Sequence, residues 1–260
     1  MFGSLVIVLP SVHSGGALHL RHGGRQVIHD CSDKFNEPPY DSVSWIAFYS
    51  DVEHEVAMVE SGYRVTLTYN LYFADMPTLD PATVAEDLTS NILYKTFADL
   101  LAEPSFLPDG GLVGFGLQYD YPINPGRTKL SDLGRVLKGE DAILFRVAEL
   151  FKLEPVFKVV YTTRRGGTYL CDGLFKDTNE VQDLGETLRR DYGGKLISGA
   201  SYEIGFRGID FEVHWVGDGS KNTEVKTYYV AYGNEASLGE LYGRVNLVVT
   251  IGKKDFRNVQ

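Results

Sequence analysis

One imidazole and one guanidinium lie near each other in the first third of the sequence. His54 precedes Arg64 by ten residues, and Thr66 follows two residues after the arginine. An imidazole is a common metal ligand, whereas a guanidinium binds a carboxylate through two parallel hydrogen bonds. Because side chains two residues apart on a strand point to the same face, Arg64 and Thr66 can contact one carboxylate together. These residues therefore suggest a metal ligand beside a carboxylate clamp.

A structural role is the alternative for both charged residues. His54 stands between Glu53 and Glu55, where a histidine is often only a solvated or hydrogen-bonded loop residue. Arginines on strands commonly form structural ion pairs. Spacing alone does not decide between the two interpretations.

The elements that must position these side chains are predicted to be strands joined by tight turns. Alternating β-branched and aromatic residues, with Gly-Gly and Pro-Pro punctuation, indicate strands over residues 5–9, 17–21, 25–29, 43–49 and 63–73. A turn at Glu60 to Gly62 is expected to let two neighbouring strands present His54 and Arg64 to one cavity.

The rest of the chain is predicted to mix helices and strands. A helix should begin at Asp80-Pro81 and end before Pro104. Further helical segments are expected at 130–137 and 142–153, and strands at 112–121, 156–161, 168–175, 202–215, 224–232 and 244–251, with a surface turn at 217–220. We expect an α+β, mainly β chain with two domains, residues 1–75 and 76–260.

Composition excludes several classes of protein. The net charge of -10, with no run of basic residues, argues against a nucleic-acid surface. No apolar stretch approaches the roughly 20 residues that span a bilayer, and residues 5–9 are better explained as a buried strand than as a leader. Cys31 and Cys171 lie far apart in no metal-ligand spacing, which favours a reducing compartment. We expect an intracellular protein, cytoplasmic or nuclear, that binds neither nucleic acid nor membrane.

The segment from Trp45 to Tyr72 carries the pattern W-x-A-F-Y-x-D-x-E-H-x-V-x-x-V-x-x-G-x-R-x-T-L-T-Y-N-L. It resembles the prolyl-4-hydroxylase-like Fe(II)/2-oxoglutarate dioxygenases, particularly a fungal group. The resemblance extends upstream through residues 2–24 and, more loosely, downstream through residues 137–139 and 232–236.

The resemblance implies a fold, an activity and roles for three residues. Residues 1–75 would be the C-terminal part of a double-stranded β-helix, a jelly-roll or cupin-like core, here incomplete, and residues 76–260 an α+β extension of unknown role. His54 would be the second metal histidine, Arg64 would bind the distal carboxylate of 2-oxoglutarate, and Thr66 would assist it. The cofactors would be Fe(II) and 2-oxoglutarate, with ascorbate as a reductant, and the reaction the hydroxylation of a peptidyl-prolyl or related substrate, either a protein or a small molecule.

The family's H-x-D motif, which supplies the other iron ligands, has no counterpart in the sequence. None of the six histidines is followed two residues later by Asp or Glu. His29-Asp30 could substitute only if a bulge turned both side chains to one face, and His13 and His22 are expected to be structural or substrate-facing. We therefore expect an N-terminally truncated form that is inactive and binds iron poorly by itself. The competing hypothesis is a non-catalytic scaffold or binding protein that keeps the fold.

The second domain offers a weaker set of candidate ligands. Asp210, Glu212 and His214 are expected to share one strand face, which could hold a metal. The preferred interpretation is a polar, solvent-facing strand whose other face carries Phe211 and Trp215. A scaffold or partner-binding role is expected for this domain.

Overall fold

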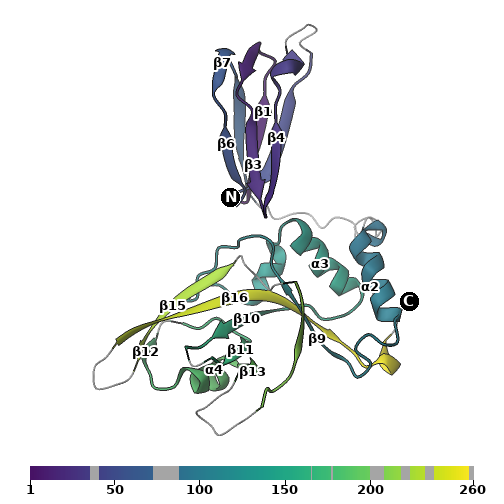
Figure 1. Ribbon diagram of the computed structural model, residues 1–260, viewed down its shortest axis with the longest axis vertical. Helices are drawn as coiled ribbons and strands as arrows, with labels where there is room; N and C mark the ends of the chain where they lie inside the picture. The colour runs from purple at the N-terminus through teal and green to yellow at the C-terminus, as the bar shows by residue number, and fades with distance from the viewer. Residues whose placement is uncertain are drawn as a thin grey trace. The chain divides into compact units, whose positions relative to one another are not determined.

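The computed structural model describes residues 1–35, 41–72, 88–164, 166–176, 178–199, 208–217, 223–231 and 237–257. The chain forms two compact units, Met1–Pro77 and Thr78–Gln260. Both are built mainly from β-strands (Figure 1). The expected domain boundary after residue 75 and the expected helix start at Asp80-Pro81 lie outside the described residues.

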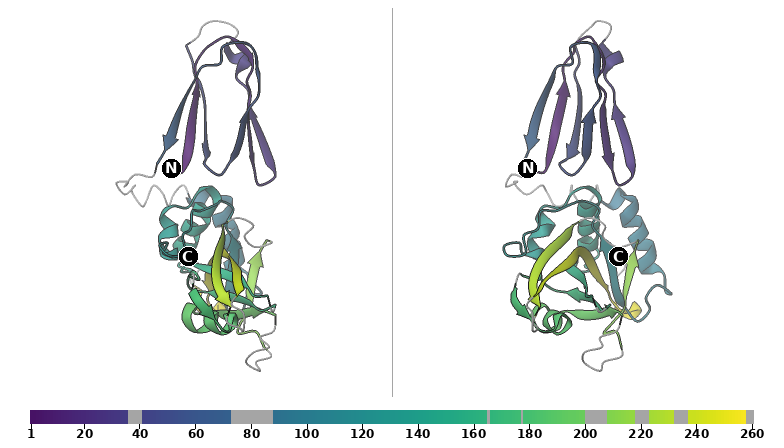
Figure 2. Two further views of the ribbon diagram at one scale, coloured as in Figure 1. Left: turned by 90° about the vertical axis from the view of Figure 1, so that its left-hand side faces the viewer. Right: turned by 60° about the vertical axis from the view of Figure 1, so that its left-hand side comes forward.

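Unit 1 consists of two layers of antiparallel strands. The first layer is a sheet of order β5-β1-β8, formed by Ser44–Tyr49, Gly3–Val8 and Thr66–Leu71. The second layer has the sheet β4-β3-β6 and the pair β2-β7, formed by Arg25–His29, Leu18–His22, Glu53–Val56, His13–Gly15 and Val59–Gly62. The chain passes back and forth between the layers, which face each other in Figure 2.

Backbone hydrogen bonds make the second layer continuous. Gly16 N donates to Met58 O and Ala57 N donates to Ala17 O, both at 2.9 Å, so that β2-β7 continues the ladder of β3-β6. Gly62 has a φ of +73°, a conformation that glycine adopts without strain, where the chain leaves this layer for β8.

Two side-chain contacts identify the inward faces of the layers. Ser44 of β5 lies 3.2 Å from His29 of β4, and the rings of Phe48 of β5 and His54 of β6 are 5.0 Å apart. By the period of two, Val8 then points inward, where it is fully buried with Cys31 and Phe35.

The outward face of the first layer is apolar. Trp45, Leu67 and Tyr69 lie on it and are 64%, 45% and 51% exposed. They are register partners of Ile7 and Leu5, which share this face of β1. A contiguous exposed apolar patch on a sheet face is typical of a surface to which another element or molecule binds.

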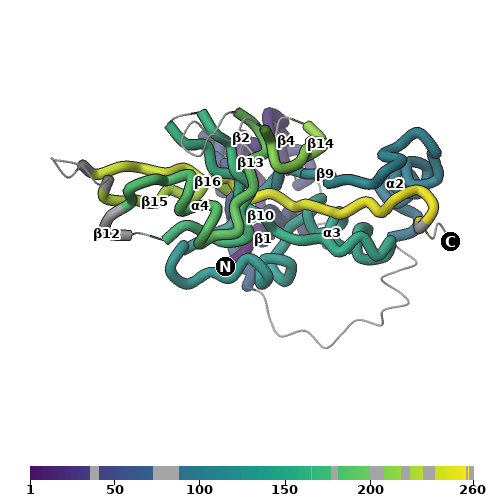
Figure 3. The backbone as a smooth tube through the Cα atoms, turned by 90° about the horizontal axis from the view of Figure 1, so that it is seen from below, coloured from purple at the N-terminus to yellow at the C-terminus, as the bar shows by residue number. Residues whose placement is uncertain are grey.

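Unit 2 contains a curled, mixed sheet of eight described strands. Its main order is β12-β15-β16-β10-β11-β13, and β9 pairs with both β16 and β14. The strands are Thr178–Val181, Glu224–Ala231, Ser237–Ile251, Val156–Thr162, Thr168–Cys171, Lys195–Ser198, Gly111–Gly116 and Val213–Val216. The 15-residue β16, yellow in Figure 3, pairs with β15, β10 and β9.

Helices cover one face of this sheet. These are α2 (Ile92–Ala102), α3 (Gly139–Leu150) and α4 (Leu184–Tyr192), with short 3-10 turns at Leu130–Arg135 and Lys254–Phe256. Ring contacts join α2 to β9 through Phe97 and Phe115, and α3 to β10 through Phe145 and Phe157. None of the described helices is long and apolar enough to cross a bilayer.

Several predicted elements are confirmed, one of them to the residue. The strand Arg25–His29 has the predicted bounds, and α2 ends at Ala102, before Pro104. The strand β16 includes the predicted residues 244–251 but begins seven residues earlier, at Ser237. The mainly β character expected for the chain is confirmed.

Other predictions are wrong. Residues 117–121 and 172–175 are not strands, and α4 was not predicted, although its ends carry helix signals. Asp183 caps its first turn by accepting a hydrogen bond from Glu186 N at 2.9 Å, and Gly193 ends it with a φ of +62°. The helix has nine residues, of which four are charged and only two are leucines, so the sequence shows little apolar helical spacing there.

The carboxylate of Asp141 ties α3 to the segment after β9. It is 2% exposed and accepts hydrogen bonds from Gln118 N at 2.9 Å, Tyr119 N at 3.2 Å and the Tyr121 hydroxyl at 2.8 Å. Burial raises the pKa of this carboxyl, and the hydrogen bonds oppose that effect.

Replacing Asp141 should destabilise unit 2. Asp141→Ala leaves Gln118 N, Tyr119 N and the buried Tyr121 hydroxyl without this acceptor, and we expect a loss of about 3 kcal/mol in the free energy of unfolding. Urea unfolding followed by the fluorescence of Trp215, in a Trp45→Phe background, measures it. Glu149→Ala on the exposed face of α3 is the control and should change stability by less than about 0.5 kcal/mol. Equal losses in the two variants would contradict the anchoring role of Asp141.

Candidate functional site

His54 lies on the inward face of β6, and its side chain is exposed. Its Nδ1 is 3.1 Å from the carbonyl oxygen of Val52, and its ring packs against Phe48. A carbonyl can only accept, so Nδ1 must carry the proton in this contact. The Nε2 lone pair of the neutral ring is therefore available to a metal or a proton donor.

Thr66 and Arg64 lie at the opposite end of the first layer. Thr66 is the first residue of β8, pairs with Val8 and shares the inward face of the sheet. Arg64 precedes the strand, and its Cδ would be 2.7 Å from a Cβ on Gly16. The prediction that Arg64 stands on one strand with Thr66 is wrong, because residues 63–65 form the crossing between the layers.

The predicted arrangement of His54 and Arg64 on neighbouring strands is also wrong. Residues 60–62, expected to be a turn, belong to strand β7, which pairs with β2. His54 contacts Phe48, the register partner of Ser4, whereas Thr66 is the partner of Val8. Ser4 and Val8 are four residues apart on β1, which corresponds to about 14 Å along the strand. The His54 imidazole and the end of the layer that carries Arg64 and Thr66 therefore lie at two different levels of the space between the layers.

The guanidinium of Arg64 has the environment of an anion site. It is half-buried, and no hydrogen bond or ion pair joins it to any residue in the described part of the chain. It lies close enough to His29 to act on it: burial first, then the positive charges of Lys34 and Arg64, lower the pKa of that imidazole. An unpaired, half-buried cation favours an anionic ligand.

The other histidines of unit 1 do not complete a metal site with His54. His13 is 3% exposed, with Nδ1 2.7 Å from Ser11 O. The carboxylate of Asp30 accepts a hydrogen bond from Ser32 N at 2.9 Å, which lowers its pKa. It thus caps the turn that follows His29 instead of joining the imidazole. In the described part of the chain, no group of three His, Cys, Asp or Glu side chains could hold a metal ion.

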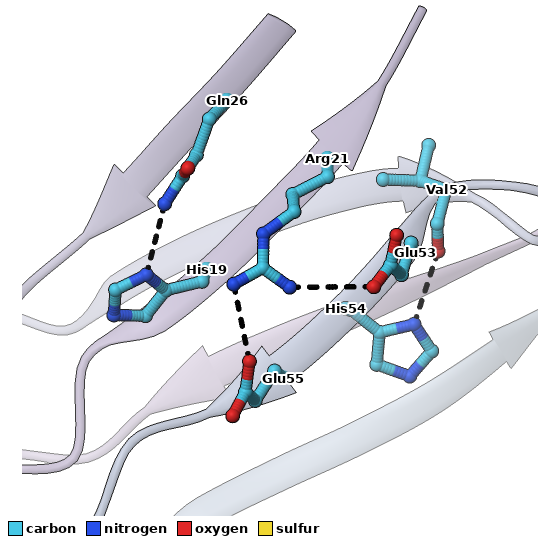
Figure 4. A network of polar contacts seen from close by, with 7 residues as sticks. All are labelled: His19, Arg21, Gln26, Val52, Glu53, His54 and Glu55. Carbon is cyan, nitrogen blue, oxygen red and sulfur yellow. Dashed lines mark hydrogen bonds and ion pairs between the residues drawn. The ribbon is translucent and has the colours of Figure 1, made fainter. Parts of the chain in front are cut away.

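The outward face of the β4-β3-β6 sheet carries a polar network (Figure 4). Arg21 donates to Glu53 at 3.3 Å and to Glu55 at 3.1 Å, and Gln26 contacts His19 at 3.1 Å. The two glutamates that flank His54 in sequence therefore point away from it, as the alternation of a strand requires. They serve in surface ion pairs and cannot ligate a metal with His54.

In unit 2 the expected group of Asp210, Glu212 and His214 does not come together as one strand face. Strand β14 begins only at Val213. Asp210 accepts hydrogen bonds from Leu196 N at 2.6 Å and from Arg189, so its role is structural. Glu212 instead lines a pocket that the sequence did not indicate, because the pocket residues come from strands far apart in the chain.

Comparisons with protein-family models, with curated proteins and with solved structures find no match. The site must therefore be interpreted from its own geometry.

Gly16 should be required for the position of Arg64. In Gly16→Ala, the new Cβ meets the Arg64 side chain at 2.7 Å and Val59 at 3.0 Å, at a φ of +74°. We expect a loss of about 2–3 kcal/mol in the stability of unit 1, from backbone strain and overpacking together. Urea unfolding followed by Trp45 fluorescence, in a Trp215→Phe background, measures the loss.

Gly24→Ala is the matched control for the backbone strain. Gly24 has a φ of +75° with nothing within 4 Å of an added Cβ, so only the strain of about 1 kcal/mol remains. If both variants lose the same stability, the contact between Gly16 and Arg64 has no energetic role.

Proposed function

We propose that unit 1 is part of the core of an Fe(II)/2-oxoglutarate dioxygenase of the prolyl-4-hydroxylase-like kind. The part of the active site that we assign to this chain binds a carboxylate of 2-oxoglutarate through Arg64, with Thr66 assisting. The observation that carries the proposal is the half-buried Arg64 guanidinium, which has no partner in the described part of the chain and lies two residues before the inward-facing Thr66.

The topology of unit 1 supports this assignment. Two antiparallel layers face each other, and the chain alternates between them as β1, β2-β3-β4, β5, β6-β7 and β8. Such alternation is how a double-stranded β-helix is wound, and it places His54 and Thr66 on inward faces. The resemblance of residues 45–72 to the family adds the expected roles of these residues. A peptidyl-prolyl substrate is part of the same proposal.

The described residues do not fit a complete iron site. His54 offers one free imidazole nitrogen, and no carboxylate or second imidazole joins it in the described part of the chain. An iron site of this class needs two histidines and one carboxylate. We therefore assign His54 as a candidate single ligand and derive no oxidative step for this chain.

A non-catalytic carboxylate-binding scaffold is the second candidate function. The incomplete ligand set in the described residues favours it, because carboxylate binding at Arg64 needs no metal. Both candidate functions require carboxylate binding at Arg64. Only the dioxygenase would also turn over 2-oxoglutarate.

Carboxylate binding at Arg64 is testable by calorimetry on the full chain. We expect 2-oxoglutarate to bind and Arg64→Met to weaken it by roughly tenfold or more, since a charge-assisted pair is lost. Arg21→Met is the matched control, because Arg21 pairs with Glu53 and Glu55 on the outward face, and it should leave affinity unchanged. Equal affinity in the wild type and Arg64→Met would refute the site.

His29 provides an independent readout of the same event. A carboxylate bound at Arg64 offsets one of the positive charges that lower the pKa of His29, so the pKa of His29 should rise on binding. An NMR titration of the histidine resonances, with and without 2-oxoglutarate, measures it. Arg64→Met should raise this pKa without ligand and abolish the ligand effect.

Metal binding and turnover separate the two candidate functions. Mn(II), as an air-stable substitute for Fe(II), should bind weakly to the full chain through His54, and His54→Ala should abolish this binding whereas His19→Ala on the outward face should not. Succinate formation from 2-oxoglutarate with Fe(II) and ascorbate would overturn the scaffold function. No succinate, with 2-oxoglutarate binding intact, would refute catalysis by this chain.

A further inference from the structure

The curled sheet of unit 2 lines an open pocket of about 710 Å³. Its walls include β13, at one end of the main strand order, and β14, which pairs with β9. Asp210, three residues before β14, joins this segment to β13, because its N–H donates to Leu196 O at 2.7 Å while its carboxylate accepts from Leu196 N. A volume of this size is typical of small-molecule sites.

An indole forms a flat wall of the pocket. Trp215 on β14 lies over Gly114 of the neighbouring β9, where an added Cβ would meet the ring at 2.5 Å. The absence of a side chain on Gly114 lets the indole rest on the sheet. Because the ring is held in this way, it offers the pocket a preorganised stacking surface.

Aliphatic side chains continue this wall. Val160 of β10, Ile197 of β13 and Val213 of β14 line the pocket from three strands. Together with Trp215 they pack on the buried Leu170 and Val248 of the same sheet face. The apolar part of a ligand would thus meet a rigid surface.

Two unpaired charges of opposite sign share the pocket. Arg244 of β16 and Glu212, just before β14, both line it, and both are exposed. Within the described part of the chain, neither forms an ion pair, with the other or with a third residue. The backbone that carries Arg244 is fixed, because the buried Asn246 donates from Nδ2 to Arg244 O at 2.8 Å. Thr168 and Ser198 add hydroxyl groups to the lining.

We propose that this pocket binds a small zwitterion with a flat apolar body, of the aromatic α-amino acid class. Its carboxylate pairs with Arg244, its ammonium pairs with Glu212, and its ring stacks on Trp215. A ligand with only one charge would leave either the cation or the carboxylate of the pocket without a partner. The proposal is independent of unit 1 and of the 2-oxoglutarate site.

Three related probes test each part of this assignment on the full chain. L-Tryptophan carries both charges, tryptamine lacks the carboxylate, and indole-3-propionate lacks the ammonium. By calorimetry, we expect L-tryptophan to bind at least roughly tenfold more tightly than either analogue, because each analogue loses one charge-assisted contact. Equal or tighter binding of indole-3-propionate would overturn the zwitterion assignment in favour of an organic acid, and no binding of any probe would overturn the site.

Variants of the pocket assign each contact to a residue. Arg244→Met should weaken L-tryptophan roughly tenfold and leave tryptamine unchanged, whereas Glu212→Gln should weaken L-tryptophan and leave indole-3-propionate unchanged. Both residues are exposed, so neither change threatens the fold. Trp215→Leu should weaken all three probes. The opposite pairing of variants and probes would refute the proposed orientation.

Surface charges elsewhere in unit 2 provide the controls. Arg146→Met and Glu149→Gln remove the exposed ion pair on α3 and should not change the affinity for any probe. Arg64→Met should also leave L-tryptophan binding intact. Loss of binding in these controls would show that the probes respond to overall charge and would overturn the site.

Discussion

The antiparallel pairing of β1 with β5 on one edge and β8 on the other organises unit 1. Each residue of β1 from Gly3 to Val8 has a register partner on both sides. Because side chains alternate along each strand, this double register decides which residues face the second layer. It places Val8, Thr66 and Ser44 at one level and Phe48, with the His54 ring against it, at another.

The two candidate groups of unit 1 therefore have separate physical roles. Arg64 lies where the chain crosses between the layers, close to the turn glycines and beside His29, so its charge is held in a half-buried position. His54 lies on a strand whose outward neighbours are engaged in ion pairs with Arg21. Carboxylate binding needs only the first group, whereas metal chemistry needs more ligands than the second provides.

In both units, the pairing and alternation of strands position the candidate side chains. In unit 2 the long β16 pairs with three strands and carries buried Leu247 and Val245 on the helix-covered face and Arg244 on the pocket face. The same alternation thus supplies the core and the pocket from one strand. The apolar outward face of unit 1, with Trp45 and Tyr69, follows from this rule as well.

The sequence by itself determined the local structure and the candidate residues that lie close together in the chain. Alternation and glycine turns predicted the strand Arg25–His29 to the residue, proline placed the end of α2, and the motif of residues 45–72 singled out His54, Arg64 and Thr66. Only the tertiary structure decided how these residues are arranged, because backbone pairing between distant strands sets their register and their layer. That is why His54 and Arg64 lie at two levels of the interlayer space and not side by side. It is also why the pocket of Glu212, Trp215 and Arg244 was not predicted: its residues come from separate strands, and no spacing along the chain connects them.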